Sequence, residues 1–430
     1  MRDIVVISYF AVLVVLALGR PHIALGLWVW TALGTPNSLT FGFSGSVRYN
    51  LIAAIITILS CLSFKRDTPV RPNASVLIAL IFVLWTLLST AMAIHDSSNL
   101  IRVLDGWLRG IVLAAMTLII VRQKLHFVVI AWTIVLGIGL YSGIEGLKYF
   151  ASAGSHRIVG PQNSNLHDNN HLAMAINMML PFAIFLLRDL KKPSSRLAML
   201  LFIATSILAV VGTDSRGGFA GLAIVLLSWA ILSKRKRLVA PFLILGLIAG
   251  ASFVPQTYID RISTISEASE EGSFQSRVIS WKQSTLIALD NPFTGGGFHA
   301  VQNAFVWERY SRDFHRLDFI DTEHASIYSF KAAHSIYFEV LGDHGFVGLF
   351  LFLLVFISSG IAAIRLSKSK PPKPELSWIP HFATACTLSL AAFAVSGALL
   401  SMAYFELAWL LVALISSLTA LEKHSRSSPT

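Results

Sequence analysis

Apolar runs separated by short polar segments extend along the whole chain. Several approach the ~20 residues that a helix needs to cross a bilayer. We therefore predict an all-α, polytopic membrane protein with about twelve transmembrane helices. The predicted spans are 4–19, 49–64, 74–94, 108–121, 125–150, 171–187, 197–213, 217–232, 238–254, 346–366, 378–401 and 404–421.

A shorter run, 23–36, has 14 residues, which suits a re-entrant or interfacial segment. The C-terminal segment 422–426 and Arg2 are both basic and favour the cytoplasm, so we expect an even number of crossings. If 23–36 does cross, the N-terminus moves to the outer side. We interpret 4–19 as a retained anchor rather than a cleaved signal peptide.

Basic residues mark one side of this predicted bundle. The loops 65–66, 188–196, 234–237 and 365–373 are rich in Lys and Arg, so the positive-inside rule assigns them to the cytoplasm. An Arg fork matches phosphate oxygens, so arginines gathered on the other side indicate a site for a phosphate-bearing lipid. Anchoring at the headgroups is the alternative for any single arginine. The outer residues of interest are Arg48, Arg157, Asp168, Arg216, Arg277 and His334.

The composition supports the membrane assignment. Hydrophobic residues make up 55% of the chain and charged residues 13%, against roughly 25% charged in soluble proteins. The net charge of +11 follows the predicted topology, which argues against nucleic-acid binding. Cys61 and Cys386 both fall in apolar runs, so we expect neither a disulfide nor a metal site from them.

Three regions follow from this pattern. Residues 1–254 form a transmembrane bundle of about nine spans with outer segments 95–109 and 151–170, residues 255–345 a large outer loop region, and residues 346–430 the last spans and a cytoplasmic tail. The segment 95–109 has the pattern of an interfacial amphipathic helix. Long loops are functional or disordered, and the aromatic content of 255–345 favours order.

His334 stands where an apolar helical face enters a span. A histidine with a pKa of about 6.5 can accept a hydroxyl proton near neutral pH. The structural alternative is a capping or interface histidine. The roles of Asp343 and His344, which follow in the same motif, stay open.

A second motif combines Arg277 with Trp281, four residues later, on one face of a short helix. The nearby segment 295–297 is a glycine triplet, which permits an unusual turn or a close backbone approach. It lacks the Lys-Ser/Thr of a P-loop, so nucleotide binding is not supported.

Two further polar segments adjoin the spans. The turn 213–218 carries Asp214 and Arg216, which either pair with each other or face a polar substrate. Asp168 precedes a span, where it serves as an N-cap or helps to present free N–H groups to an anion. No metal is predicted, because the outer histidines lack a ligand-like spacing; they are His156, His167, His171 and His315.

Taken in order, these pieces resemble the O-antigen ligase family, whose wider group includes O-antigen polymerases and protein O-oligosaccharyltransferases. The resemblance covers most of the chain. It rests on Ser215-Arg216-Gly217, on the outer loop with Arg277, and on His334-Ser335-x-Tyr337 running into Gly345-x-x-Gly348-Leu349. The family often has Glu where this chain has Asp343.

The resemblance implies an inner-membrane protein of C-type glycosyltransferase architecture, with a periplasmic helical cap and a periplasmic active site. It implies a metal-independent transfer without a cofactor, from an undecaprenyl-diphosphate-linked glycan to the lipid A–core oligosaccharide. Arg216 and Arg277 would bind the donor diphosphate, and His334 would be the general base. Arg157, Arg48 and Asp168 are lesser candidates for substrate binding. Direct attack by one acceptor would invert the anomeric centre.

Alternatives remain at this point. A polymerase or a protein O-oligosaccharyltransferase would use the same donor chemistry on another acceptor. A transporter or flippase also suits twelve spans. Transporters, however, place polar groups near the midplane of the bilayer, often at two related broken helices. The predicted spans are nearly free of charge, and no internal repeat is evident.

Overall fold

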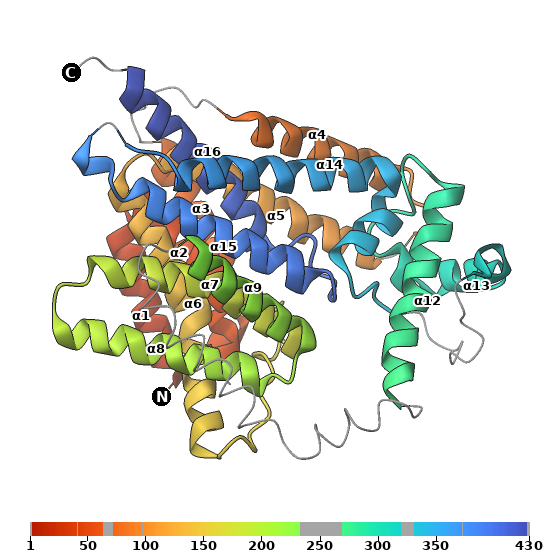
Figure 1. Cartoon of the computed structure of the whole chain (residues 1–430), viewed down its shortest axis with the longest axis horizontal. Helices are drawn as coiled ribbons and strands as arrows, with labels where there is room; N and C mark the ends of the chain where they lie inside the picture. Colours follow the sequence, from red (N-terminus) through yellow and green to blue (C-terminus); the bar gives the residue numbers. More distant parts are fainter. Residues whose placement is uncertain are drawn as a thin grey trace.

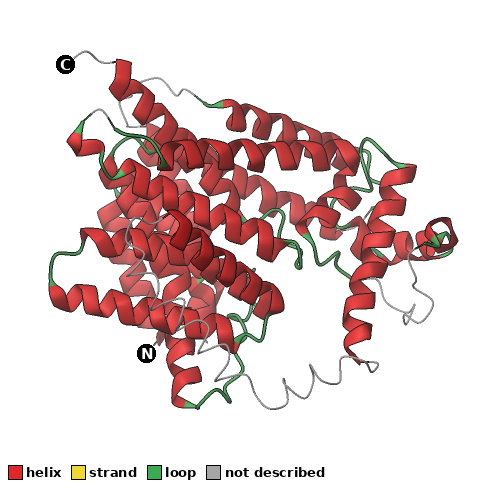
Figure 2. Ribbon diagram, in the orientation of Figure 1, coloured by secondary structure: helices red, strands yellow, loops and turns green. Residues whose placement is uncertain are grey.

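The structure is a computed structural model that describes residues 2–40, 42–62, 72–96, 98–232, 269–319, 331–371 and 373–427. Within these ranges the chain forms helices and loops and no strand (Figure 2), which confirms the all-α prediction for this part. The helices are α1 (Arg2–Ala17), α2 (Pro21–Gly34), α3 (Tyr49–Leu62), α4 (Ala74–Ala91), α5 (Ser98–Ile120), α6 (Lys124–Ala151), α7 (Asn169–Asp189), α8 (Pro193–Gly212), α9 (Arg216–Leu232), α12 (Ser269–Asp290), α13 (Ala304–Ser311), α14 (Ile336–Ser367), α15 (Ile379–Gly397) and α16 (Glu406–Ser427), with short 3₁₀ turns at Pro36–Leu39, Phe43–Ser46, Ala300–Gln302, Phe314–Leu317 and Pro374–Leu376.

Local signals explain where several helices begin. Asn73 and Asn303 accept hydrogen bonds from backbone N–H groups in the first turns of α4 and α13. Such N-caps satisfy donors that a helix start leaves without partners. Proline stands at the first or second position of α2, α8 and α15, where its missing N–H costs nothing.

Eight of the described helices are long and apolar enough to cross a membrane, fewer than the twelve predicted spans. They are α4 to α8 and α14 to α16. The predicted spans near α1, α3 and α9 form helices of 14 to 17 residues. At a rise of about 1.5 Å per residue, the described parts of these helices are shorter than the ~30 Å hydrocarbon core; the residues that follow α3 and α9 lie outside the described ranges. The predicted span 238–254 lies outside the described residues.

Charged helix ends gather at one end of the bundle. Lys124, which begins α6, forms an ion pair with Asp189 at the end of α7, with 3.1 Å between Nζ and Oδ2. Arg188 donates to Nδ1 of His381 near the start of α15 (2.6 Å). We call this the basic end, defined by residues 122–124, 188–196 and 365–371. The opposite end, here the site end, holds the starts of α7, α9 and α14, and α12 and α13 extend beyond it (Figure 1).

The short run predicted to be re-entrant or interfacial forms α2, most of which is buried. Its His22 stacks on His126 near the start of α6, with ring centroids 4.7 Å apart. Gly34, at the end of α2, approaches Gly137 so closely that a β-carbon would lie 3.1 Å from the Gly137 Cα. Because the two helices run side by side in the same direction, α2 leads away from the basic end.

The start of α1 lies beside the segment that follows α2. Asp3 Oδ1 accepts hydrogen bonds from the backbone N–H groups of Gly42 and Ser44, both at 3.1 Å. Arg2 is thus on the same side as Arg48, whereas α16 carries the C-terminus toward the basic end (Figure 1). This packing favours the stated alternative, in which the 23–36 run crosses and the N-terminus lies on the outer side.

Most of the predicted interfacial segment 95–109 and of the predicted span 108–121 belongs to one continuous helix, α5 (Ser98–Ile120). Trp107, on the apolar face of this segment, is buried against Phe82 of α4 and Trp409 of α16, with centroids 5.9 and 4.6 Å away. Its Nε1 donates to Thr86 Oγ1 (3.1 Å). The amphipathic pattern thus reflects helix packing along this face.

A kink in α14 is filled by the glycine triplet. Gly345 leaves helical geometry, with φ of 69° and ψ of −170°. Gly296 N–H donates to the Gly342 carbonyl and Gly297 N–H to the Asp343 carbonyl, both at 2.8 Å. A β-carbon on Gly295 would lie 2.5 Å from the Gly345 nitrogen. The predicted close backbone approach is confirmed, and its partner is the backbone of α14.

We expect Gly345→Ala to destabilise the protein by about 1–3 kcal/mol, because alanine is strained at positive φ. Its β-carbon would also lie 2.7 Å from the carbonyl oxygens of Pro292 and Phe293. Gly360→Ala is the matched control in the same helix, since no atom lies within 4 Å of its β-carbon position. Thermal unfolding in detergent checks this prediction. Equal melting temperatures for the two variants would contradict it.

Candidate active site

Side-chain hydrogen bonds join the start of α7 to the turn before α9. Asp168 Oδ1 caps α7 by accepting from the N–H groups of Asn170 (2.8 Å) and His171 (3.4 Å). Asn169 Nδ2 donates to the Thr213 carbonyl, and Ser215 Oγ donates to Asn170 Oδ1, both at 2.7 Å. Asp168 is therefore an N-cap, and the residues that follow it fix the predicted 213–218 turn.

Arg216 is the first residue of α9 and directly follows this turn. Its side chain is exposed at the site end. Gly218 lies so close to α7 that a β-carbon would be 2.6 Å from the Ala173 Cβ. The small residue at this position lets the start of α9 pack beside the start of α7 and places Arg216 near Asp168.

Arg277 lies on α12, one helical turn before Trp281. The Trp281 Nε1 donates to the Ala333 carbonyl (2.8 Å), and its ring stacks on Phe338 with centroids 5.0 Å apart. Trp281 thus fixes α12 to the first turn of α14 and to the residue before His334. Because Arg277 and Trp281 share a helix face, Arg277 is brought toward the same region.

His334 precedes α14 and is half-buried. Its φ of 47° is in the left-handed region, which is uncommon for a residue with a side chain. Its N–H donates to the Ser401 Oγ in the segment between α15 and α16, at 2.8 Å. His334 is therefore held by contacts with distant parts of the chain rather than by the cap of α14.

Electrostatic interactions join four of the predicted site residues. Burial lowers the pKa of His334, the positive charge of Arg277 lowers it further, and Asp168 opposes them. Burial also lowers the pKa of Arg277, with a further contribution from Arg216, while Asp168 again acts in the opposite direction. The structure thus brings Asp168, Arg216, Arg277 and His334 together at the site end.

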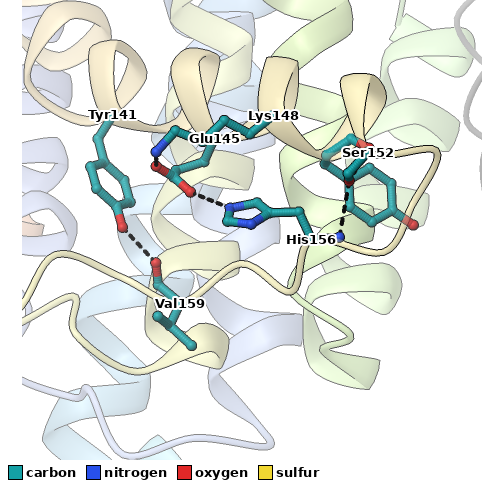
Figure 3. Close-up of polar contacts among 7 residues, drawn as sticks. Tyr141, Glu145, Lys148, Ser152, His156 and Val159 are labelled. Carbon is teal, nitrogen blue, oxygen red and sulfur yellow. Dashed lines mark hydrogen bonds and ion pairs between the residues drawn. The ribbon is translucent and has the colours of Figure 1, made fainter.

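The loop that leads to Asp168 is fixed to α6. Glu145 accepts from His156 Nε2 (2.7 Å) and Lys148 Nζ (2.6 Å), and Tyr141 Oη donates to the Val159 carbonyl (2.7 Å) (Figure 3). The Glu145 side chain is 9% exposed. These contacts restrain the segment 152–160.

The structure does not bring Arg48 or Arg157 into this cluster. Both side chains are exposed. Neither takes part in an electrostatic interaction with Arg277 or His334. Within the described part of the chain, Arg277 interacts with His334, and Arg216 interacts with Arg277.

Several of the outer histidines have structural partners. His156 contacts Glu145, and His171 Nδ1 lies 3.2 Å from the Asn165 carbonyl. Among the described residues, no group of three His, Cys, Asp or Glu side chains is arranged to hold a metal ion.

Sequence reasoning missed Ser401 and Asn170. Ser401 contacts His334 across 67 residues of sequence, and no local pattern indicates such a contact. Asn170 lies in a polar run that we considered for helix capping and for presenting N–H groups to an anion. Its bond to Ser215 shows that the run also positions the turn before α9.

The cluster has the groups needed for one kind of chemistry. Two guanidinium groups can hold phosphate oxygens, and they remain charged at neutral pH. An imidazole with a lowered pKa is neutral there and can accept a proton. The arrangement suits a reaction in which a phosphate-bearing group leaves and a hydroxyl is deprotonated.

Comparisons with known families agree with this chemistry. Residues 199–353 match the family described as O-antigen ligase, and this range contains Arg216, Arg277 and His334. Residues 1–191, which include Arg48, Arg157 and Asp168, match the family of unknown function DUF5935. No curated protein matches the chain.

Proposed function

We propose, on the premise that this chain carries an O-antigen ligase domain, that it is an O-antigen ligase. It would transfer a preassembled glycan from undecaprenyl diphosphate to the lipid A–core oligosaccharide. The observation that supports the proposal is that Arg277 interacts with both Arg216 and His334, while Trp281, one turn further along the same helix, is hydrogen-bonded to the residue before His334. Arg216, Arg277 and His334 all lie inside the matched range.

In the proposed reaction the acceptor hydroxyl oxygen attacks the anomeric carbon of the glycan. The bond between this carbon and the diphosphate oxygen breaks, and the hydroxyl proton passes to His334. Arg216 and Arg277 stabilise the negative charge that develops on the leaving undecaprenyl diphosphate, which is the role that a metal has in other transferases. A single displacement inverts the anomeric centre.

The charge distribution supports an inner-membrane location with the site in the periplasm. The basic loops 188–196 and 365–371 lie at the end opposite Arg216 and His334. Basic loops favour the cytoplasm, so the site end would face outward. The lipid-linked donor and the lipid A–core acceptor would both reach it from the outer leaflet.

Loss of the gene distinguishes the acceptors. For the ligase we expect lipopolysaccharide without O-antigen and an accumulation of long, lipid-linked chains. Lipopolysaccharide capped by a single repeat would instead identify a polymerase. Normal lipopolysaccharide with an unglycosylated protein would identify a protein O-oligosaccharyltransferase. Either of the last two results overturns the assignment of the acceptor.

The pH dependence of transfer reports the environment of His334. The neutral imidazole is the base, and its pKa is lowered, so activity is retained at pH 7 and falls as the pH drops through the lowered pKa. Asp168→Asn removes a charge that raises this pKa and should move the acid limb to lower pH. Arg277→Gln removes a charge that lowers it and should move the limb to higher pH.

Profiles of kcat/KM for the wild type and both variants check this prediction. Asparagine retains the oxygen that caps α7, so Asp168→Asn should preserve the fold. Shifts in the same direction for the two variants would contradict His334 as the titrating base.

A further inference from the structure

The backbone around His334 is held by side chains on both sides. Its own N–H donates to Ser401 Oγ, and the preceding carbonyl, of Ala333, accepts from Trp281 Nε1. A non-glycine residue at positive φ persists only where its surroundings fix it. The position of His334 therefore depends on the segment that carries Ser401.

That segment, residues 398–405, connects α15 to α16 and is attached to the first turns of α14. The Ala403 N–H donates to Glu339 Oε2 (2.8 Å), and Tyr404 Oη donates to Asp343 Oδ2 (3.0 Å). Trp409 Nε1 donates to the Ala403 carbonyl (3.1 Å). Glu339 fixes the backbone only two residues from Ser401.

Burying the carboxyl groups of Glu339 and Asp343 in α14 costs free energy of folding. The two residues are 5% and 1% exposed and lie in a helix that qualifies as a membrane span. No ion pair involves either carboxyl group among the described residues. An ionisable residue at such a position indicates a functional role.

We propose that Glu339 is a positioning residue for His334 and acts through the 398–405 segment. The Glu339 oxygen holds the Ala403 N–H, the segment holds Ser401 Oγ in place, and Ser401 fixes the His334 backbone. This inference rests on the proposed function of His334 as the general base. Position 339 requires only an oxygen that accepts this hydrogen bond, so we expect glutamine to substitute for Glu339 without loss of function.

The experiment compares Glu339→Ala, Glu339→Gln and the wild type in a purified transfer assay. We expect Glu339→Ala to lower kcat by about 10²-fold, the effect of a displacement of about 1 Å at a catalytic group. The donor KM should change little, and Glu339→Gln should keep most of the activity. A Glu339→Gln variant as inactive as Glu339→Ala would overturn the proposal.

A matched control removes another buried glutamate. Glu422 lies on α16 near the basic end and pairs with Arg426. Glu422→Ala should leave kcat unchanged.

A second variant keeps the test valid if Glu339→Ala fails to fold. Ser401→Ala removes the hydroxyl that accepts the hydrogen bond from the His334 N–H, and it should lower kcat by the same factor, with recovery in Ser401→Thr. Full activity in Ser401→Ala would overturn the proposal.

A readout that needs no catalysis separates this inference from the proposed function. The rate of carbethoxylation of His334, followed by mass spectrometry, reports the surroundings of its imidazole. We expect a changed rate in Glu339→Ala and an unchanged rate in Glu339→Gln and Glu422→Ala. An unchanged rate in Glu339→Ala overturns the positioning role. If the variants show the expected carbethoxylation rates but the wild-type protein transfers no glycan, the proposed function is contradicted, while the positioning of His334 by Glu339 still holds.

Discussion

His334→Ala lowers the turnover of glycan transfer by about 10²–10⁴-fold, the usual contribution of a general base. The variant should still bind the lipid-linked donor, because Arg216 and Arg277, rather than His334, hold the diphosphate. The measurement pairs kcat with the donor Kd for purified wild type and variant.

The control is His315→Ala, which removes an exposed histidine from the same outer region. It should transfer glycan at the wild-type rate. Full activity in His334→Ala would remove the base assignment. Loss of donor binding without loss of turnover per bound donor would make His334 a binding residue instead.

Arg216→Lys and Arg277→Lys each lower turnover by about 10²–10³-fold, the range seen when one donor to a developing charge is removed. Lysine keeps the charge but loses the planar fork that contacts two phosphate oxygens. Both variants should insert and fold, since Arg216 is exposed and Arg277 only half-buried. Transfer rates normalised to folded protein check the prediction.

Lysine variants of three further arginines serve as controls for this prediction. Arg312→Lys alters an exposed residue that pairs with Glu308 on α13 and should have no effect. Arg48→Lys and Arg157→Lys should have small effects, because neither residue is joined to the cluster. Full activity in both Arg216→Lys and Arg277→Lys would reduce these two groups to membrane anchors.

Much of the site could be predicted because its signals are local. Arg277 and Trp281 are four residues apart, so helical spacing alone puts them on one face, and the structure uses that face to contact Ala333. Arg216 stands in a charged turn at a helix end, and His334 at the start of an apolar helix. Basic loops indicated which ends of the helices lie together.

The remaining features depend on packing between distant segments. The 14-residue run that forms α2 is too short to be assigned a crossing from its length, and only its contact with α6 shows its direction. The apolar face of 95–109 has the same periodicity whether it meets lipid or α4 and α16. The contact of Ser401 with His334 and the fit of Gly295 against Gly345 join segments with no pattern in common.

The most direct test is transfer by the purified protein in liposomes with an undecaprenyl-diphosphate-linked glycan and lipopolysaccharide that lacks O-antigen. Nucleotide is omitted and a chelator is present. We expect a ligated lipopolysaccharide product of inverted anomeric configuration from the wild type and almost none from His334→Ala. No product from a folded, donor-binding wild-type protein, or equal product from His334→Ala, would contradict the account.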